Sequence, residues 1–220
     1  MNRALYRIIF LIWIFTAGLS SHARAASNDL IRLGSVEIDT VQRAVIATGW
    51  VNQVSGPIEL LACGKTGKLH ESIFVMNIDP KDLHAALLLL GLKPGQGPTG
   101  LGAGRPEGPG LYVWVEWEVD GLQQKERVES LIYNARTEQA LPPILWTFTG
   151  SVVENGDYKA TAEDSLIASY WDPWAVINIS HPTGGDDDAL YALGEKLPPA
   201  QTPVRFMLMP LSLDDPVPLR

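Results

Sequence analysis

The sequence contains a single cysteine, Cys63, among 220 residues. One thiol per chain excludes an internal disulfide framework, an all-cysteine zinc site and an iron–sulfur cluster with four cysteine ligands. Basic residues are also scarce: 17 lysines and arginines stand against 25 aspartates and glutamates, which gives a formal net charge of −8. Because nucleic-acid-binding proteins present a basic patch to the phosphate backbone, this balance argues against a nucleic-acid partner.

A complete nucleotide-binding motif is also missing. Residues 95–100 spell Gly-x-Gly-x-x-Gly, but a dinucleotide-binding motif must follow a strand and open a helix, and here Pro98 interrupts a Gly- and Pro-rich stretch. Residues 64–66, Gly-Lys-Thr, match the end of a phosphate-binding loop, yet Glu59 stands where that loop requires its first glycine. We therefore expect neither NAD nor ATP as a cofactor.

Only one long apolar run is present, at residues 8–19. Arg3 and Arg7 precede it, and Ala-Arg-Ala at residues 23–25 follows it as a cleavage site. This pattern predicts a secretory signal peptide at residues 1–25, since the run is shorter than the roughly 18 residues of a membrane span. Cleavage removes three arginines and no acidic residue, which leaves 195 residues with a net charge of −11. We expect a soluble protein without a membrane span, exported to the periplasm or the extracellular space.

Short segments with alternating polar and apolar residues, or with many β-branched residues, predict one strand-rich domain over residues 26–213. Glycine and proline, 36 residues in total, punctuate these segments. We expect a mostly antiparallel sheet. Its strands are predicted at residues 36–39, 43–51, 58–62, 70–78, 111–119, 124–133, 144–149, 158–170, 174–179 and 204–211.

Two helices are expected to complete an α+β fold. Asp79 fits an N-cap, Pro80 the first helical position and Gly91 a stop, which predicts a helix at residues 80–90. Six consecutive alanines and leucines leave this helix little polar face, so we expect it to be buried in the core. A second, short helix is expected at residues 187–193.

Two segments are expected to lack regular structure. Residues 91–110 contain eight glycines and four prolines. A loop of this length inside a compact domain is usually functional or disordered, and we expect a mobile flap. The Pro-rich tail at residues 214–220 is expected to fray.

The segment around Cys63 has the most distinctive chemistry. Cys63 and His70 flank a turn rich in glycine and lysine, and His84 on the expected helix could return to the same region. Thiolate and imidazole ligands suit copper or zinc, so one hypothesis is a metal site of these three residues. A second is a thiol nucleophile that His70 and the nearby lysines activate. A third, structural interpretation treats Cys63 as a small buried hydrophobe and His84 as a core histidine.

Two further features have both a functional and a structural interpretation. Trp171 and Trp174 flank a turn, and they would form a platform for a sugar ring if exposed, or part of the core if buried. The three aspartates at residues 186–188 could ligate calcium, but they lack the spaced oxygen ligands of a helix–loop–helix calcium site. A helix N-terminus explains these acidic residues better.

Several stretches resemble one known family. Residues 59–63 (Glu-Leu-Leu-Ala-Cys), 67–73 (Gly-Lys-Leu-His-Glu-Ser-Ile) and 83–95, which begin Leu-His-Ala-Ala, resemble the YdjY-type domain of exported bacterial proteins. Motifs at residues 146–151 and 198–204 fit this family too. The resemblance implies export and a single domain over most of the mature chain. It marks, without assigning roles, the motif positions His70, Glu71, Ser72 and His84.

No acid–base pair and no nucleophile–base–orienter triad emerges from the residue spacing, so we expect a non-enzymatic binding or accessory module. Its partner would be a cell-envelope protein or a small ligand. One alternative is a metal- or thiol-dependent enzyme centred on Cys63, His70 and His84. Another is a glycan-binding module that uses Trp171 and Trp174.

Overall fold

The computed structural model describes residues 30–211. The expected signal peptide and the expected Pro-rich tail lie outside the described residues. Within residues 30–211, no helix has the length and apolar content that a membrane crossing requires.

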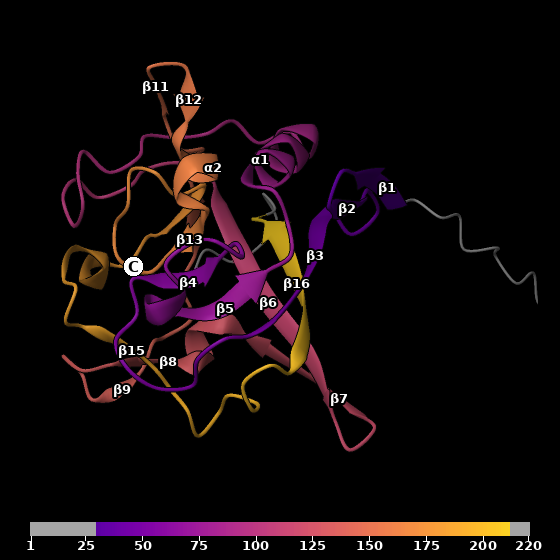
Figure 1. Cartoon of the computed structure of the whole chain (residues 1–220), viewed down its shortest axis with the longest axis vertical. Coiled ribbons are helices and arrows are strands. Elements are labelled where there is room, and N and C mark those ends of the chain that lie inside the picture. Colours follow the sequence, from indigo (N-terminus) through magenta and orange to yellow (C-terminus); the bar gives the residue numbers. More distant parts are fainter. Residues whose placement is uncertain (1–29, 212–220) are drawn as a thin grey trace, which may run out of the picture.

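Eight strands pair edge to edge in a ring, which forms a closed barrel (Figure 1). Pairing between β3 and β5 closes the ring. Six contacts around the ring are antiparallel, whereas β4–β5 and β13–β14 are parallel. In ring order the strands are β3 (Ala44–Val51), β16 (Pro203–Pro210), β6 (Gly110–Val119), β10 (Trp146–Phe148), β14 (Ile177–Ile179), β13 (Ser165–Ala168), β4 (Leu60–Cys63) and β5 (Ser72–Met76).

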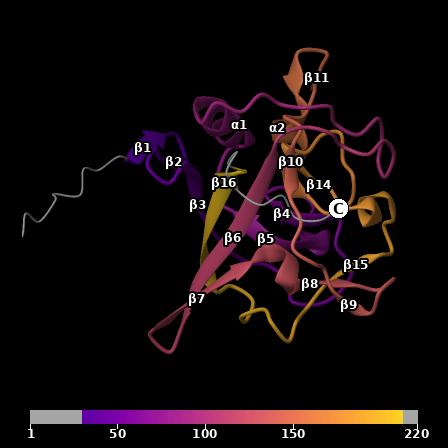
Figure 2. The ribbon, with the colours of Figure 1, turned by 180° about the vertical axis from the view of Figure 1, so that it is seen from behind.

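The side chains that fill the barrel come from the alternation that the sequence shows. In β6, Leu111, Val113, Val115 and Trp117 are buried, while the intervening residues are half-exposed. Because successive side chains of a strand point to opposite faces, one face of β6 lines the core. The wall that β6, β10 and β14 form is seen from behind in Figure 2.

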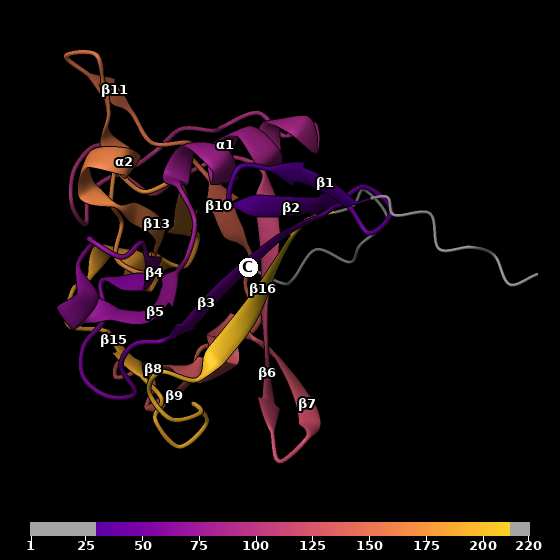
Figure 3. The same cartoon turned by 45° about the vertical axis from the view of Figure 1, so that its right-hand side comes forward.

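The remaining strands attach to the barrel from outside. β2 pairs with β3 and carries β1 at its edge, while β7 forms a hairpin with β6 that projects from the barrel (Figure 3). A small sheet has the order β15–β8–β9, and β11 pairs with β12. These strands are β1 (Leu30–Leu33), β2 (Val36–Asp39), β7 (Leu122–Arg127), β8 (Ile132–Asn134), β9 (Gln139–Ala140), β11 (Val153–Glu154), β12 (Asp157–Tyr158) and β15 (Leu190–Ala192).

Short helical turns interrupt several of the expected strands. The expected strand at residues 158–170 contains the five-residue helix α2 (Lys159–Glu163) before β13 begins. The return strand expected at residues 124–133 is divided into β7 and β8. Three 3-10 turns complete the described structure: Leu69–Glu71, Val128–Leu131 and Pro182–Gly185.

The helix at residues 80–90 forms, but it is not buried. In α1 (Pro80–Leu89) the core-facing residues include Leu83 and Leu87, whereas Leu88 and Leu89 are exposed. The apolar run covers the whole circumference of the helix, because 3.6 residues complete one turn. The barrel contacts only one side of α1, so the expectation of a buried helix is wrong.

Residues 187–193 do not form a helix. Asp186 accepts a hydrogen bond from the backbone N–H of Asp188 through its own side chain, which favours a turn. Residues 190–192 then pair with β8 as strand β15. Pairing with the free edge of β8 therefore outweighs the local preference of these residues for a helix.

With two helices outside a closed strand ring, the fold is mainly β, and the α+β prediction is wrong.

The Gly- and Pro-rich loop at residues 91–110 is held by backbone hydrogen bonds. Gln96 and Glu107 exchange two such bonds, of 2.7 and 2.9 Å. Gly95 donates to the carbonyl oxygen of Phe148 at 2.9 Å; a Cβ at Gly95 would lie 1.9 Å from the Glu107 oxygen, so this contact needs glycine. The loop that we expected to be a mobile flap is thus anchored to β10.

Candidate functional site

A polar cleft of about 420 Å³ opens between the N-terminus of α1, the helix α2 and the turn that follows β4. Of the lining residues within 30–211, Ile78 and Pro80 are the two without a polar side chain. The polar lining residues are Ser35, Lys65, Thr66, Asn77, Asp79, Asp82, Thr161 and Asp164.

One wall of the cleft is the first turn of α1. The Asp79 carboxylate caps the helix, because its Oδ1 accepts from the backbone N–H of Lys81 at 2.8 Å. Asp82 Oδ2 accepts from the backbone N–H and from the hydroxyl of Ser35, at 2.8 and 2.7 Å. Carboxylates are stabilised near the positive end of a helix dipole, so the first turn suits both aspartates. The β1–β2 turn is thereby fastened to α1.

The opposite wall is built around Asp164, which ends α2 in a left-handed conformation with φ of 50°. Its Oδ2 accepts from the backbone N–H and from the hydroxyl of Thr66, at 2.9 and 2.8 Å. Its backbone oxygen accepts from the N–H of Gly64 at 2.9 Å. A Cβ at Gly64 would lie 1.8 Å from Asp164 Oδ1, so glycine is required for this close approach.

Negative charge dominates the cleft. In the described part of the chain, three carboxylates line it, and Lys65 is its one basic lining residue. Within residues 30–211, the hydrogen bonds of each carboxylate go to one oxygen: Oδ1 of Asp79 and Oδ2 of both Asp82 and Asp164. The second oxygen of each takes no hydrogen bond from residues 30–211, although an ionised carboxylate offers about four acceptor positions. The cleft can therefore accept hydrogen bonds from a bound molecule.

Cys63 lies at the end of β4 and is fully buried. It packs in an apolar cluster with Val75 and Ala168, against the half-buried Trp50. Burial raises the pKa of the Cys63 thiol; a side-chain hydrogen bond with Ser72 opposes this shift, and the charge of Asp164 adds to it. Both properties disfavour the thiolate, which is the form that acts as a nucleophile or a metal ligand.

His70 and Ser72, two motif residues that follow Cys63, differ in their exposure to solvent. His70 lies in a 3-10 turn with 77% of its side chain exposed, and its Nε2 is 3.6 Å from the Glu71 carboxylate. Ser72 is buried at the start of β5, where its hydroxyl donates to the carbonyl oxygen of Lys68 at 2.6 Å. These contacts stay within the segment and stabilise its turn.

His84 lies half-buried on α1. Its Nδ1 is 2.9 Å from the Tyr158 hydroxyl, and its ring packs edge-on against Phe148 with 5.2 Å between ring centroids. No group of three or more His, Cys, Asp or Glu side chains in the described part of the chain could hold a metal ion. Among residues 30–211, Cys63, His70 and His84 therefore do not form such a ligand group. The copper or zinc site of these three residues stays a prediction from the sequence.

Trp171 and Trp174 are both half-buried. The Trp171 indole N–H donates to the carbonyl oxygen of Ile179 at 3.1 Å, and the ring packs against the main core. The ammonium of Lys159 lies 5.3 Å from the ring centroid of Trp174. Each ring thus already has a partner within the protein, and the glycan platform stays a prediction.

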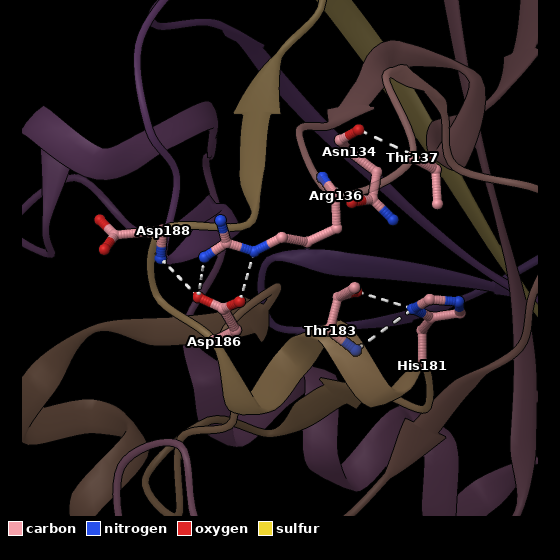
Figure 4. Close-up of polar contacts among 7 residues, drawn as sticks. All are labelled: Asn134, Arg136, Thr137, His181, Thr183, Asp186 and Asp188. Carbon is pink, nitrogen blue, oxygen red and sulfur yellow. Dashed lines mark hydrogen bonds and ion pairs between the residues drawn. The ribbon is translucent and has the colours of Figure 1, made fainter.

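The acidic stretch at residues 186–188 is tied to the small sheet (Figure 4). Arg136 forms two hydrogen bonds with the carboxylate of Asp186, of 2.7 and 2.9 Å. The nearby Nδ1 of His181 lies 2.7 Å from the Thr183 hydroxyl and accepts from the Thr183 N–H at 3.3 Å. These bonds give Asp186 and His181 structural partners on either side of the 3-10 turn.

Comparison with known families identifies the chain. The family model described as the YdjY domain matches residues 36–209, a span that runs from β2 into β16. The chain therefore belongs to the YdjY domain family, and the resemblance seen in its motifs is confirmed. No curated protein and no solved structure matches the chain significantly.

Most residues of the cleft carry no functional signal in the sequence. Asp79 and Asp82 fit the first turn of a helix, and Lys65 lies in a Gly/Lys turn. Asp164 falls in a segment whose pattern predicts a continuous strand. Only the fold shows that these residues, of which Lys65 and Asp164 are 99 positions apart, line one cleft.

Proposed function

We propose that this YdjY domain is an exported, non-enzymatic binding module that holds a small polar ligand in the cleft between α1 and α2. The observation that carries the proposal is the lining of this cleft: eight polar side chains, three of them carboxylates, around a volume of about 420 Å³. Specific ligand sites in proteins are concave and carry a few polar groups that fix the ligand's orientation.

The lining favours a ligand that brings its own hydrogen-bond donors and a positive charge. Asp79, Asp82 and Asp164 each have one carboxylate oxygen that takes no hydrogen bond from residues 30–211. Hydrogen bonds to charged groups are shorter and stronger than neutral ones, so an ammonium group is the preferred donor. Hydroxyls of Thr66 and Thr161 also line the cleft and suit a ligand with several hydroxyl groups. An amino sugar unites both properties.

A binding role fits the chemistry of this site better than catalysis. Among residues 30–211, the cleft lining includes no histidine and no cysteine, the usual proton-transfer and nucleophilic groups. Export is part of the proposal and rests on the signal-peptide pattern of residues 1–25. Intact-mass measurement of the secreted protein is expected to show a chain that starts at Ala26.

Binding can be tested by NMR with two probes that differ in one group. D-glucosamine carries an ammonium where D-glucose carries a hydroxyl. We expect glucosamine to shift the backbone amide signals of Thr66, Asn77 and Thr161, and glucose to shift them much less at equal concentration. The effect should weaken at high salt, because exposed charges are screened.

Matched variants locate the site. Asp82→Asn and Asp164→Asn remove a charge but keep a carbonyl oxygen for Ser35 or Thr66, and each is expected to weaken glucosamine binding about tenfold. Asp187→Asn, on an exposed residue outside the cleft, should leave binding unchanged. Equal shifts with both sugars, or equal loss in Asp187→Asn, would contradict the proposed site.

A further inference from the structure

The two helices that wall the cleft are joined by a side-chain contact. His84 lies on α1, one turn beyond Pro80, and Tyr158 is the N-cap residue of α2. The Nδ1 atom of His84 is 2.9 Å from the Tyr158 hydroxyl oxygen. Since α1 supplies Asp79 and Asp82 to the cleft and α2 precedes Asp164, this contact fixes one wall relative to the other.

The carbonyl oxygen of Gly150 determines where the protons lie in the contact between His84 and Tyr158. The Tyr158 hydroxyl donates to the carbonyl oxygen of Gly150 at 3.1 Å. Because that proton is used on Gly150, the proton between His84 and Tyr158 belongs to Nδ1 of the neutral imidazole. The ring also packs edge-on against Phe148 and Tyr158, with centroid distances of 5.2 and 5.7 Å. Neutral His84 is therefore well accommodated.

Within residues 30–211, the contacts of the His84 ring include no carboxylate that would compensate a charge on it. These contacts are Phe148 from β10, Gly150 from the following turn, and the titratable Tyr158 from β12. Burial lowers the pKa of His84, and the hydrogen bond to Gly150 offsets only part of this shift. Among residues 30–211, burial and the Gly150 backbone account for the shift in the pKa of His84.

The contact is also electrically linked to the cleft. Burial raises the pKa of Tyr158, and the negative charge of Asp79, a cleft residue, raises it further. Tyr158 therefore stays protonated throughout the neutral range. Of the two partners, His84 is the one that gains a charge as the pH falls, and burial lowers its pKa.

We propose that the His84–Tyr158 contact is a proton-sensitive latch, which holds α1 against α2 while His84 is neutral and releases α1 when the ring becomes charged. This inference rests on the proposed ligand cleft. A second ring proton places an uncompensated charge beside Phe148, and water solvates that charge better than the protein does. The ring then leaves its site, α1 loses its anchor, and the spacing of the cleft carboxylates changes.

The latch can be tested without a ligand, on the mature chain. The methyl groups of Thr66 and Thr161 lie on the cleft lining, and NMR follows them together with the His84 ring from pH 8 to pH 5. We expect both methyl signals to shift with the midpoint at which His84 titrates. Amide exchange of Ala86 and Leu87 in α1 should accelerate about tenfold below that midpoint, as local opening becomes more frequent.

Three variants separate the latch from other titrations. His84→Gln and Tyr158→Phe are each expected to abolish the pH dependence of the Thr66 and Thr161 methyl signals. His181→Gln removes another half-buried histidine that lies outside the cleft lining, and it should leave that dependence intact. Flat methyl signals while His84 titrates, or unchanged titration in His84→Gln, would overturn the latch. Because no ligand is present, failure of glucosamine binding and failure of the latch are separate results.

Discussion

At the scale of single residues, Asp172 shows how this barrel tolerates a buried carboxyl group. Its two oxygens accept from the Ser165 hydroxyl and from the Trp174 N–H, both at 2.8 Å. The backbone N–H of Asp172 donates to the side-chain oxygen of Asn178. The side-chain amide of Asn178 donates in return to the backbone oxygen of Asp172. Burial raises the pKa of Asp172, while the Trp174 and Ser165 hydrogen bonds favour the ionised form. Each polar group of this buried set has a partner.

Removing that carboxyl group is expected to be costly. Asp172→Ala leaves the Ser165 hydroxyl and the Trp174 N–H without their acceptor, and we expect the free energy of unfolding to fall by about 3 kcal/mol. Urea denaturation measures this value. The control Asp187→Ala, at an exposed residue, should change it by less than about 0.5 kcal/mol. Equal effects of the two variants would show that the buried network contributes nothing.

The single cysteine allows a second test at this scale. Because Cys63 is fully buried and burial raises its pKa, we expect a thiol reagent such as DTNB not to react with the native protein. Reaction in urea should appear together with the unfolding transition. Rapid labelling of the native protein would instead support the thiol-nucleophile hypothesis.

At the scale of elements, a buried ion pair attaches the 3-10 turn at Val128–Leu131 to the barrel. Arg127 donates to both carboxylate oxygens of Glu129, at 2.8 and 3.0 Å, and also to the carbonyl oxygen of Ile144. The indole N–H of Trp146 in β10 donates to Glu129 Oε1 at 2.9 Å. Glu129 is therefore the buried joint between the β7 hairpin, this turn and the wall of the barrel.

Neutralising Glu129 tests this joint. Glu129→Gln leaves the largely buried Arg127 charge without its counter-ion, and we expect a loss of about 3 kcal/mol in the free energy of unfolding. The matched control is Glu37→Gln, which breaks the exposed pair with Arg32 and should cost less than about 1 kcal/mol. Thermal or urea unfolding of both variants decides between these expectations; a Glu129→Gln variant as stable as the control would refute the joint.

At the scale of the whole molecule, the pairing between β3 and β5 closes the ring, and we call this pairing the seam. β3 and β5 pair through three residue pairs, and Gly49 opposite Met76 is the first of them. A Cβ at Gly49 would lie 2.1 Å from the carbonyl oxygen of Val75. The backbones of the two strands approach so closely there that a side chain at residue 49 would force them apart.

Gly49→Ala is therefore expected to weaken closure of the barrel. We expect a loss of at least about 3 kcal/mol in stability, and faster amide exchange along β3 and β5 than in the rest of the ring. In the control Gly97→Ala, the new Cβ would meet Thr149 Cβ at an ordinary 3.7 Å, so stability should change little. A Gly49→Ala protein with unchanged exchange would show that the seam accommodates a methyl group.

Local structure was largely predictable where adjacent residues decide it. The cap at Asp79 and the alternation of β6 are both confirmed. The helix expected at residues 187–193 fails because strand β8 offers its backbone to Leu190–Ala192. The residues around 187–193 carry no information about β8, because that strand lies more than 50 positions earlier in the chain.

The sequence by itself determined the family, the positions of most strands and both ends of α1, because short-range periodicity and capping chemistry fix these features. Only the tertiary structure decided that the strands close into a barrel, that one side of α1 stays exposed, and that the single cysteine is buried. It also decided the cleft, which joins turns and helices from distant parts of the chain. Pairing between distant strands depends on packing and backbone hydrogen bonds over the whole ring, and no local pattern encodes that choice.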